Sequence, residues 1–310
     1  MRVVVMGAGA VGSYYGAMLA QSGADVVLVG RAAHVAAIRS SGLLLERETV
    51  VETIAIEAST DASVVAGADW VLCCVKSGDT EAAGEAMRPF LSPEAGVLSL
   101  QNGVDNAQRL SAVLGRSVEP VAVYVAVDMP APGHVRHHGR GELVMGLVPG
   151  AEPLLAAWAA AGVPVEVSDH VASALWTKLV INCAYNAMSA LSGWPYGPLW
   201  AAEGVQAVLH DVVNECLLVA QAHQVALPAG VQAMVRGIAE TMPHQHSSMA
   251  QDLARGRPTE IAQLNGWVVR EADRLGLPAP ANRVLVALVR LREAGQTQGE
   301  HKVLDCPKAI

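Results

Sequence analysis

The sequence is poor in aromatic residues and in charge, and it has no long uninterrupted apolar run. Phenylalanine occurs once in 310 residues, so the apolar bulk comes from Ala, Val and Leu. Charged residues make up 16% of the chain against 52% hydrophobic residues, a balance that excludes an intrinsically disordered protein and indicates a compact one. No unbroken stretch of about 18 apolar residues suggests a membrane-spanning helix. A chain of 310 residues suggests about two domains.

Basic residues are too few and too scattered to form a general positive field. Lysine and arginine number 21 against 29 aspartates and glutamates, so the formal charge is 21 − 29 = −8. We therefore expect neither nucleic acid nor an anionic membrane as a partner. An anionic ligand would have to be held by a few placed cations.

The cysteines are few, odd in number and without CxxC spacing. Cys73 and Cys74 lie in an apolar, strand-like run, as small buried thiols do in a reducing compartment. The segment Met1–Ala20 is apolar, but four glycines interrupt it and no cleavage-type boundary follows it, so it is not a convincing signal peptide. We therefore expect a cytoplasmic protein.

A glycine-rich turn near the N-terminus is the first motif that indicates a function. The β-branched run in Arg2–Met6 predicts a strand, and Gly7-Ala8-Gly9-Ala10-Val11-Gly12 separates it from a helical pattern at Ser13–Gln21. This is GxGxxG in the strand–turn–helix context that dinucleotide binding requires, although glycines are common in turns. Gly7 permits the tight turn, Gly9 lets the backbone approach a pyrophosphate, and Gly12 lets the helix pack closely on the strand.

The residue after the second predicted strand bears on which nicotinamide cofactor is bound. That strand, Asp25–Val29, ends at Gly30-Arg31. An NAD site carries Asp or Glu about 20 residues past the glycines to bind the ribose 2′-hydroxyl, whereas a guanidinium suits a 2′-phosphate. Arg31 therefore predicts NADP(H), the alternative being a solvated arginine at a strand end.

Strand and helix patterns continue to alternate through the first half of the chain. Further strands are predicted at Trp70–Val75, Val97–Leu100 and Pro120–Val127. The alternation predicts a doubly wound parallel sheet of the Rossmann type, in which ligands bind beyond the carboxyl ends of the strands. Lys76 and Asn102 stand at two such ends, so we expect both to contact the cofactor, a plain loop role being the alternative.

Three histidines, His134, His137 and His138, cluster in one short polar run. No Cys or carboxylate stands beside them at a ligand-like spacing, and the run is typical of a polar strand or turn. We interpret it as structural and predict no metal site.

From about Val171 the strand patterns give way to long helical ones. These cover Ala172–Ala190, Gly204–Gln224, Pro228–Thr241, Thr259–Leu275 and Asn282–Glu293. We predict an NADP-binding α/β domain in residues 1–170, an all-α substrate domain in residues 171–294 and a loose polar tail in residues 295–310. Loops are predicted at Gly193–Pro198 and Arg255–Pro258, and Thr259 is suited to cap a helix that begins near Glu260.

The first of these helical patterns carries a polar stripe. Lys178, Asn182 and Asn186 are four residues apart, so on a helix their side chains share one face. One cation and two carboxamides amid Leu, Val and Ile are costly to bury without partners, and they suit a small ligand with a carbonyl and a carboxylate. An ordinary exposed stripe is the alternative. Taken alone, Ser248 suits a cap or surface hydroxyl, and Glu260 suits a helix-start acid.

Together these motifs resemble the ketopantoate reductase (2-dehydropantoate 2-reductase) family, within the class with 6-phosphogluconate-dehydrogenase-like C-terminal domains. The resemblance covers about residues 1–293. It rests on the glycine turn, Arg31, Val75-Lys76, Gln101-Asn102-Gly103, Trp176-Thr177-Lys178 with Asn182 and Asn186, Ser247–Asp252, and Pro258–Ile261 with Asn265-Gly266.

The resemblance implies an NADPH-dependent reduction of a 2-keto acid, most simply of 2-dehydropantoate to pantoate in pantothenate and coenzyme A biosynthesis, and it allows a homodimer. Lys178 would donate a proton to the ketone oxygen. Asn182, Asn186 and Ser248 would hold the keto acid, and Glu260 would bind near the substrate hydroxyl and the cofactor. The glycine turn, Arg31, Lys76 and Asn102 would bind NADPH.

Two departures from the family pattern bear on the substrate. The family often has Asn ten residues past the second Asn of the stripe, where this chain has Tyr196, and His244-Gln245-His246 before Ser248 also differs. Both lie where substrate side-chain contacts would be, so another 2-keto acid is an alternative substrate. A 3-hydroxy acid dehydrogenase and a non-catalytic NADPH-binding sensor are the remaining alternatives.

Overall fold

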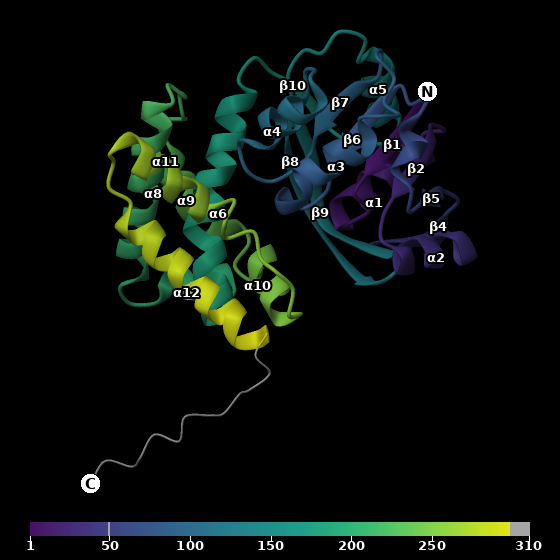
Figure 1. Ribbon diagram of the computed structural model, residues 1–310. Coiled ribbons are helices and arrows are strands. Elements are labelled where there is room, and N and C mark those ends of the chain that lie inside the picture. The colour runs from purple at the N-terminus through teal and green to yellow at the C-terminus, as the bar shows by residue number, and fades with distance from the viewer. Residues whose placement is uncertain (49, 298–310) are drawn as a thin grey trace. The chain divides into compact units, whose positions relative to one another are not determined.

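The computed structural model describes residues 1–48 and 50–297. The chain divides into two compact units, Met1–Leu175 and Trp176–Ile310. Strands alternate with helices in the first unit, and the described part of the second is helical (Figure 1). The predicted Rossmann-type α/β half followed by an all-α half is therefore confirmed as a fold class. Most of the predicted tail, residues 298–310, lies outside the described residues, whereas residues 295–297 belong to the last helix.

The centre of the first unit is a parallel sheet in the order β5-β2-β1-β6-β7-β8. The strands are β1 Arg2–Met6, β2 Asp25–Val29, β5 Glu57–Ser59, β6 Trp70–Cys73, β7 Gly96–Ser99 and β8 Glu119–Ala131. Successive residues of a strand face opposite sides, so Val3 and Val5 enter one apolar core while Val4 and Met6 enter another. The continuous β-branched run of β1 is explained by this burial on both faces.

Helices cover both faces of the sheet, which makes it doubly wound. They are α1 Ala10–Gln21, α2 Ala32–Ser41, α3 Thr80–Met87, α4 Asn106–Leu114 and α5 Glu152–Ala160, with short 3₁₀ turns η1 Ala62–Val65 and η2 Ser77–Asp79. Tyr15 of α1 and Trp158 of α5 pack in the core with Val3, and Met87 of α3 and Leu110 of α4 pack in the core with Val4.

The sheet is mixed where the sequence predicted it to be purely parallel. Its further strands are β3 Leu43–Arg47, β4 Val50–Ile54, β9 His134–Met145 and β10 Val165–Val167. β9 runs antiparallel to β8 and β4 antiparallel to β3, whereas β3 and β10 pair parallel with β9. The three clustered histidines lie on β9, so their interpretation as a polar strand is confirmed.

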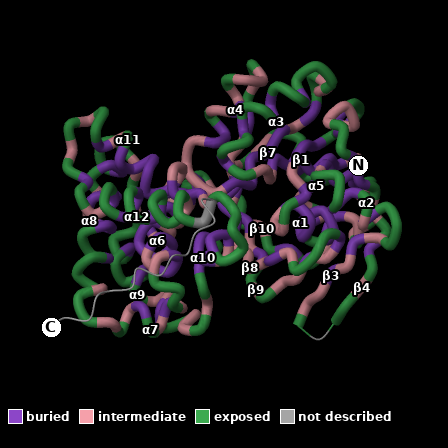
Figure 2. Tube along the Cα trace, turned by 60° about the horizontal axis from the view of Figure 1, so that its bottom comes forward, coloured by how far each residue is buried: buried purple, intermediate pink, exposed green. Residues whose placement is uncertain are grey.

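The second unit is built around one long helix that begins in the first. Its helices are α6 Val171–Ser192, α7 Tyr196–Ala201, α8 Val205–Ala222, α9 Val231–Thr241, α10 Ser248–Ala254, α11 Asn265–Leu275 and α12 Pro280–Thr297. The middle of α6 is buried (Figure 2), with Val180, Cys183 and Ala184 fully inaccessible to solvent. Among the described residues, no helix combines the length and the apolarity needed to cross a bilayer.

The helix predictions were wrong where a helix is short or where a turn has the hydrogen bonds of a single helical turn. The predicted loop Gly193–Pro198 contains the start of α7 at Tyr196, and α10 was not predicted. The helix predicted from Thr259 begins only at Asn265, so Glu260 is not in its first turn. The carbonyl of Glu260 accepts hydrogen bonds from the N–H groups of Gln263 and Leu264, at 3.0 and 3.1 Å, which forms a turn that is not continued.

A buried polar chain connects four helices of this unit. The Asn265 side-chain amide donates to the carbonyl oxygen of Cys183 on α6 and to Oδ1 of Asn282 on α12, both at 2.9 Å. Asn282 in turn donates to the Glu215 carboxylate on α8, at 2.7 Å. That carboxylate also accepts the backbone N–H groups of Ala281 and Asn282, so it satisfies N-terminal donors of α12.

Candidate functional site

The glycine turn is fixed tightly on one side and open on the other. The N–H groups of Gly7 and Ala8 both donate to the carbonyl of Val29 at the end of β2, at 3.0 and 2.8 Å. Gly7 has φ +106°, and a Cβ there would lie 2.5 Å from the Val75 nitrogen, so only glycine fits. A Cβ at Gly9 would meet no atom within 4 Å. The turn therefore presents clear backbone above the N-terminus of α1, as binding of a pyrophosphate requires.

Arg31 lies directly beside this turn. Gly30 packs so closely that a Cβ there would be 2.8 Å from Cβ of Ala8. Arg31 follows as the N-cap residue of α2, and its side chain is exposed. Its guanidinium makes no hydrogen bond or ion pair with the part of the chain that the structure describes, so the structure leaves it available to an anionic ligand.

Lys76 and Asn102 lie in the loops that follow the neighbouring strands β6 and β7. Lys76 is exposed and Asn102 is half-buried. The Ser77 hydroxyl donates to the carbonyl of Asn102 at 3.0 Å, and the Gln101 side chain donates to the carbonyl of Val75 at 3.1 Å. Because the sheet order is β2-β1-β6-β7, Arg31, the glycine turn, Lys76 and Asn102 come from adjacent strand ends. This is the edge at which α/β sheets bind ligands.

Sequence reasoning missed the buried residues that support these two loops. They are Ser77, Thr80 and Asn106, together with Gln101, which the sequence analysis named only as part of the Gln101-Asn102-Gly103 motif. Thr80 accepts from Gln101 at 2.8 Å and donates to Asn106 at 3.0 Å, so the set forms one hydrogen-bond network. Small polar residues just past a buried strand were the available signal, but the partners are 21 to 29 residues apart in the chain.

The predicted polar stripe lies on α6 in the second unit. Lys178 and Asn182 are half-buried, and Asn186 is 5% exposed. Because the helix runs unbroken from Val171 to Ser192, the four-residue spacing places the three side chains on one helical face.

Ser248 is held next to Asn186 by a neighbour that sequence analysis did not single out. Ser247 is fully buried and is the N-cap of α10, with its hydroxyl accepting from the Ala250 N–H at 3.0 Å. The same hydroxyl donates to the carbonyl of Asn186 at 3.1 Å. The cap is therefore Ser247, while Ser248 is the first helical residue and is exposed.

Glu260 lies in a turn whose flanking residues are anchored to α12 and α6. The N–H of Thr259 donates to the Glu293 carboxylate on α12 at 2.7 Å, and Asn265 contacts the carbonyl of Cys183 as described above. The turn is thus fixed at both ends, to α12 through Thr259 and to α6 through Asn265. The α6 contact is with Cys183, the residue after Asn182. Glu260 is 9% exposed.

Tyr196, which departs from the family pattern, is an interior residue. It is 8% exposed, its ring centroid lies 5.0 Å from that of Tyr185, and burial raises the pKa of its hydroxyl. Its N–H donates to the carbonyl of Gln245 at 3.0 Å. The two departures from the family pattern, at Tyr196 and at residues 244–246, are therefore in direct contact.

The three histidines of β9 are engaged in separate contacts. His134 pairs with Glu46 at 2.7 Å, His138 pairs with Asp128 at 3.0 Å, and His137 stacks on Tyr14 with ring centroids 4.6 Å apart. Among the described residues, no group of three His, Cys, Asp or Glu side chains could hold a metal ion.

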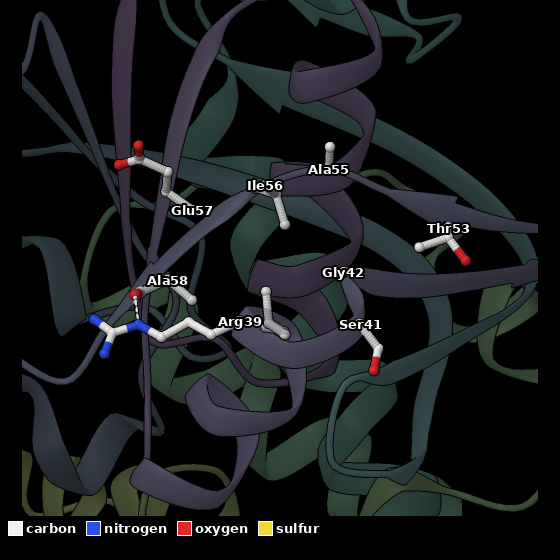
Figure 3. Close-up of a pocket in the computed structure, with 9 residues that line it drawn as sticks. Arg39, Ser41, Gly42, Thr53, Ala55, Ile56, Glu57 and Ala58 are labelled. Carbon is white, nitrogen blue, oxygen red and sulfur yellow. Dashed lines mark hydrogen bonds between the residues drawn. The ribbon is translucent and has the colours of Figure 1, made fainter.

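Two cavities, one in each unit, are lined by residues other than the predicted site residues. The cavity in the first unit, of about 610 Å³, lies at the C-terminal end of α2 (Figure 3). It is lined by Ile38, Arg39, Ser41, Gly42, Thr53 and residues 55–58. Arg39 turns toward the carbonyl of Ala58, 2.8 Å from its Nε, and away from Ser41 and Thr53. The cavity in the second unit, of about 380 Å³, lies among α7, α8 and α9.

Comparison with known proteins covers almost the whole chain. Residues 3–150 match the family described as "Ketopantoate reductase PanE/ApbA", and residues 170–293 match "Ketopantoate reductase PanE/ApbA C terminal". A 2-dehydropantoate 2-reductase of Halobacterium salinarum is 36% identical over 305 residues, which cover 94% of this chain and 99% of that protein. One of Pyrococcus horikoshii is 31% identical over 301 residues, covering 95% and 98%. The crystal structure of a PanE/ApbA family ketopantoate reductase from Ralstonia eutropha JMP134 is 56% identical, with a TM-score of 0.93 and coverage of 96% and 100%.

Proposed function

The chain belongs to the ketopantoate reductase family, and from this we propose that it uses NADPH to reduce a 2-keto acid, in the first place 2-dehydropantoate, to the 2-hydroxy acid. The stripe of Lys178, Asn182 and Asn186 carries the proposal. Binding of a dinucleotide needs the glycine turn and its neighbours but does not need this stripe, which argues against a sensor that only binds NADPH.

The residues of the first unit fit a phosphorylated dinucleotide. A Cβ at Gly9 would meet no atom within 4 Å, so the open backbone there suits a pyrophosphate. The exposed Arg31 beside the turn suits a ribose 2′-phosphate through charge-assisted hydrogen bonds. In this proposal Lys76 contacts phosphate or adenine, and Asn102 contacts the ribose near the nicotinamide. The cofactor supplies a hydride to the ketone carbon.

The residues of the second unit suit the other half of the reaction. As the ketone carbon gains a hydride, negative charge develops on its oxygen, and the Lys178 ammonium donates to that oxygen and then transfers a proton to it. The amine regains its proton from water after the alcohol leaves. Asn182, Asn186 and Ser248 hold the keto acid, and Glu260 binds near its hydroxyl and the cofactor.

A second candidate is the same reaction on a different 2-keto acid. Tyr196 favours it, because a buried aromatic side chain replaces the small amide that the family pattern often has there, on a residue whose N–H donates to the carbonyl of Gln245. In either case we propose that residues 1–170 bind NADP(H), that residues 171–294 bind the acid, and that the enzyme acts in the cytoplasm on a small molecule. The role in pantothenate biosynthesis and a homodimer stay predictions.

A substrate panel tests the proposal. The purified protein is incubated with NADPH and, in turn, with 2-dehydropantoate and with branched, straight-chain and aromatic 2-keto acids, while the absorbance of the reduced nicotinamide is followed. Oxidation with 2-dehydropantoate above all others supports the first candidate, and preference for another acid supports the second. Bound NADPH that no acid oxidises would overturn both and favour the sensor. A parallel panel of 3-hydroxy acids with NADP⁺ tests the dehydrogenase alternative.

A further inference from the structure

His34 is a buried histidine that the proposed reaction does not use. It lies in the first turn of α2, three residues after Arg31, and is 6% exposed. Its Nε2 is 3.1 Å from the hydroxyl of Ser13, the residue after Gly12 on α1. Its Nδ1 is 2.8 Å from the N–H of Gly133, in the turn between β8 and β9. One imidazole thus joins the glycine-turn helix, the helix of Arg31 and a distant hairpin.

The partners determine the protonation of this ring. A backbone N–H can only donate, so Nδ1 accepts from Gly133 and carries no proton. Nε2 then carries the proton of the neutral ring and donates to the Ser13 hydroxyl. Burial lowers the pKa of His34, in agreement with a neutral imidazole whose two nitrogens are both used.

The hairpin turn is itself firmly held, so it can serve as an anchor. The carbonyl of Gly133 accepts the N–H of Leu44 on β3 at 2.8 Å. Gly133 has φ +76°, and a Cβ at this position would lie 2.8 Å from Cβ of Ala37 on α2. The turn therefore packs directly on α2, and Ser13, at the other end of the linkage, is fully buried.

We propose that His34 is a positioning residue for the cofactor, which fixes the first turn of α2, and with it Arg31, relative to the glycine turn. It thereby sets the preference for the 2′-phosphorylated dinucleotide. The inference rests on the proposed function in one respect: it assumes that the dinucleotide binds at the carboxyl ends of β2, β1, β6 and β7. It requires no assumption about the keto acid.

The two hydrogen bonds of His34 can be separated by substitution. In His34→Asn the amide lies at the position of Nδ1 and can still accept from Gly133, but it does not reach Ser13. In His34→Gln the amide reaches the position of Nε2 and can still donate to Ser13, while the Gly133 N–H loses its acceptor. His34→Ala removes both bonds. Tyr15→Phe is the matched control. Tyr15 is buried on α1, as Ser13 is, and its hydroxyl donates to the carbonyl of Gly141 on β9 at 3.1 Å, so the variant also removes one buried hydrogen bond between α1 and a distant segment.

The dissociation constants of NADPH and of NADH are measured for each folded variant by fluorescence titration without substrate. We expect His34→Ala to weaken NADPH on the order of tenfold and NADH by about twofold or less, with the two amide variants in between. Tyr15→Phe should leave the ratio of the two constants unchanged. In the Arg31→Ala background, His34→Ala should cause little further loss of NADPH, because both substitutions remove the same contact.

An unchanged NADPH-to-NADH ratio in all folded His34 variants would overturn the inference. So would full additivity of the Arg31 and His34 substitutions, because His34 would then act independently of Arg31. If the unsubstituted protein binds NADPH but reduces no 2-keto acid, the proposed function fails while the titrations still decide the role of His34. If it binds neither nucleotide, both fail together.

Discussion

Replacement of Gly9 by alanine separates a functional requirement for glycine from a structural one. Gly9 is the N-cap residue of α1 with φ −77° and ψ −170°, a conformation that alanine adopts readily, and its Cβ would touch nothing within 4 Å. Loss of chain entropy in the unfolded state stabilises such a variant by about 0.4–1 kcal/mol, and loss of a favourable N-cap offsets this by a similar amount. The free energy of unfolding should therefore change by less than about 1 kcal/mol.

The effect on cofactor binding should be much larger. If a pyrophosphate packs on the Gly9 backbone, the new methyl group occupies its place, and relief of such overlap costs about 1–3 kcal/mol. This corresponds to binding of NADPH that is roughly 5-fold to 150-fold weaker. Fluorescence titration with NADPH and urea unfolding of the same preparation measure the two quantities.

Two other glycines serve as controls for this experiment. At Gly146, which follows β9 and caps no helix, the added Cβ also meets nothing within 4 Å, so Gly146→Ala should raise the free energy of unfolding by at most about 1 kcal/mol and leave NADPH binding unchanged. At Gly7 it would lie 2.5 Å from the Val75 nitrogen with φ +106°, so Gly7→Ala should unfold at a clearly lower urea concentration. NADPH binding by Gly9→Ala that equals the unsubstituted protein would refute the placement of the pyrophosphate.

Three further substitutions probe the remaining parts of the proposed site. Lys178→Ala should lower kcat by on the order of 10²–10⁴ while NADPH still binds, and near-normal turnover in a steady-state assay would contradict the role of proton donor. Arg31→Ala should weaken NADPH far more than NADH in the same titration, and equal losses would mean that Arg31 does not bind the 2′-phosphate. Ser247→Ala loses a helix cap and the hydrogen bond to the Asn186 carbonyl, so it should lower the free energy of unfolding by about 1–3 kcal/mol. It should also raise KM for the keto acid but not KM for NADPH. Thr241→Ala is the control, because it loses only an exposed hydrogen bond within its own helix. If Ser247→Ala leaves KM for the keto acid unchanged, as the control should, the role of Ser247 is contradicted.

The parts of the fold that could be predicted are those in which one local pattern determines the structure. The strands Arg2–Met6 and Asp25–Val29 were predicted to the residue, because β-branched runs end at glycines there. The antiparallel extension was missed because β9 is polar and glycine-rich, and its pairing with β8 and β3 is set by contacts between distant segments. The start of α11 was misplaced because the turn at residues 260–264 repeats the local hydrogen bonds of a helix.

The family and its motif residues could likewise be recognised from the sequence, whereas the residues that position them could not. Ser247 and Asn186 are 61 residues apart, and His34 and Gly133 are 99 residues apart. No local period or spacing relates such pairs, and a serine or histidine alone is compatible with many roles. Their partners become apparent only when the fold brings the segments together.

The interior position of Tyr196 limits how substrate choice could be redesigned. Its ring packs on that of Tyr185, and the next residue, Gly197, has so little space that a Cβ would lie 2.8 Å from Pro243. A direct exchange of Tyr196 for Asn would empty an aromatic-sized volume beside the ring of Tyr185. Altered turnover in that variant would report on repacking as much as on recognition. A library that varies Tyr185 and Tyr196 together, at constant combined volume, would distinguish the two.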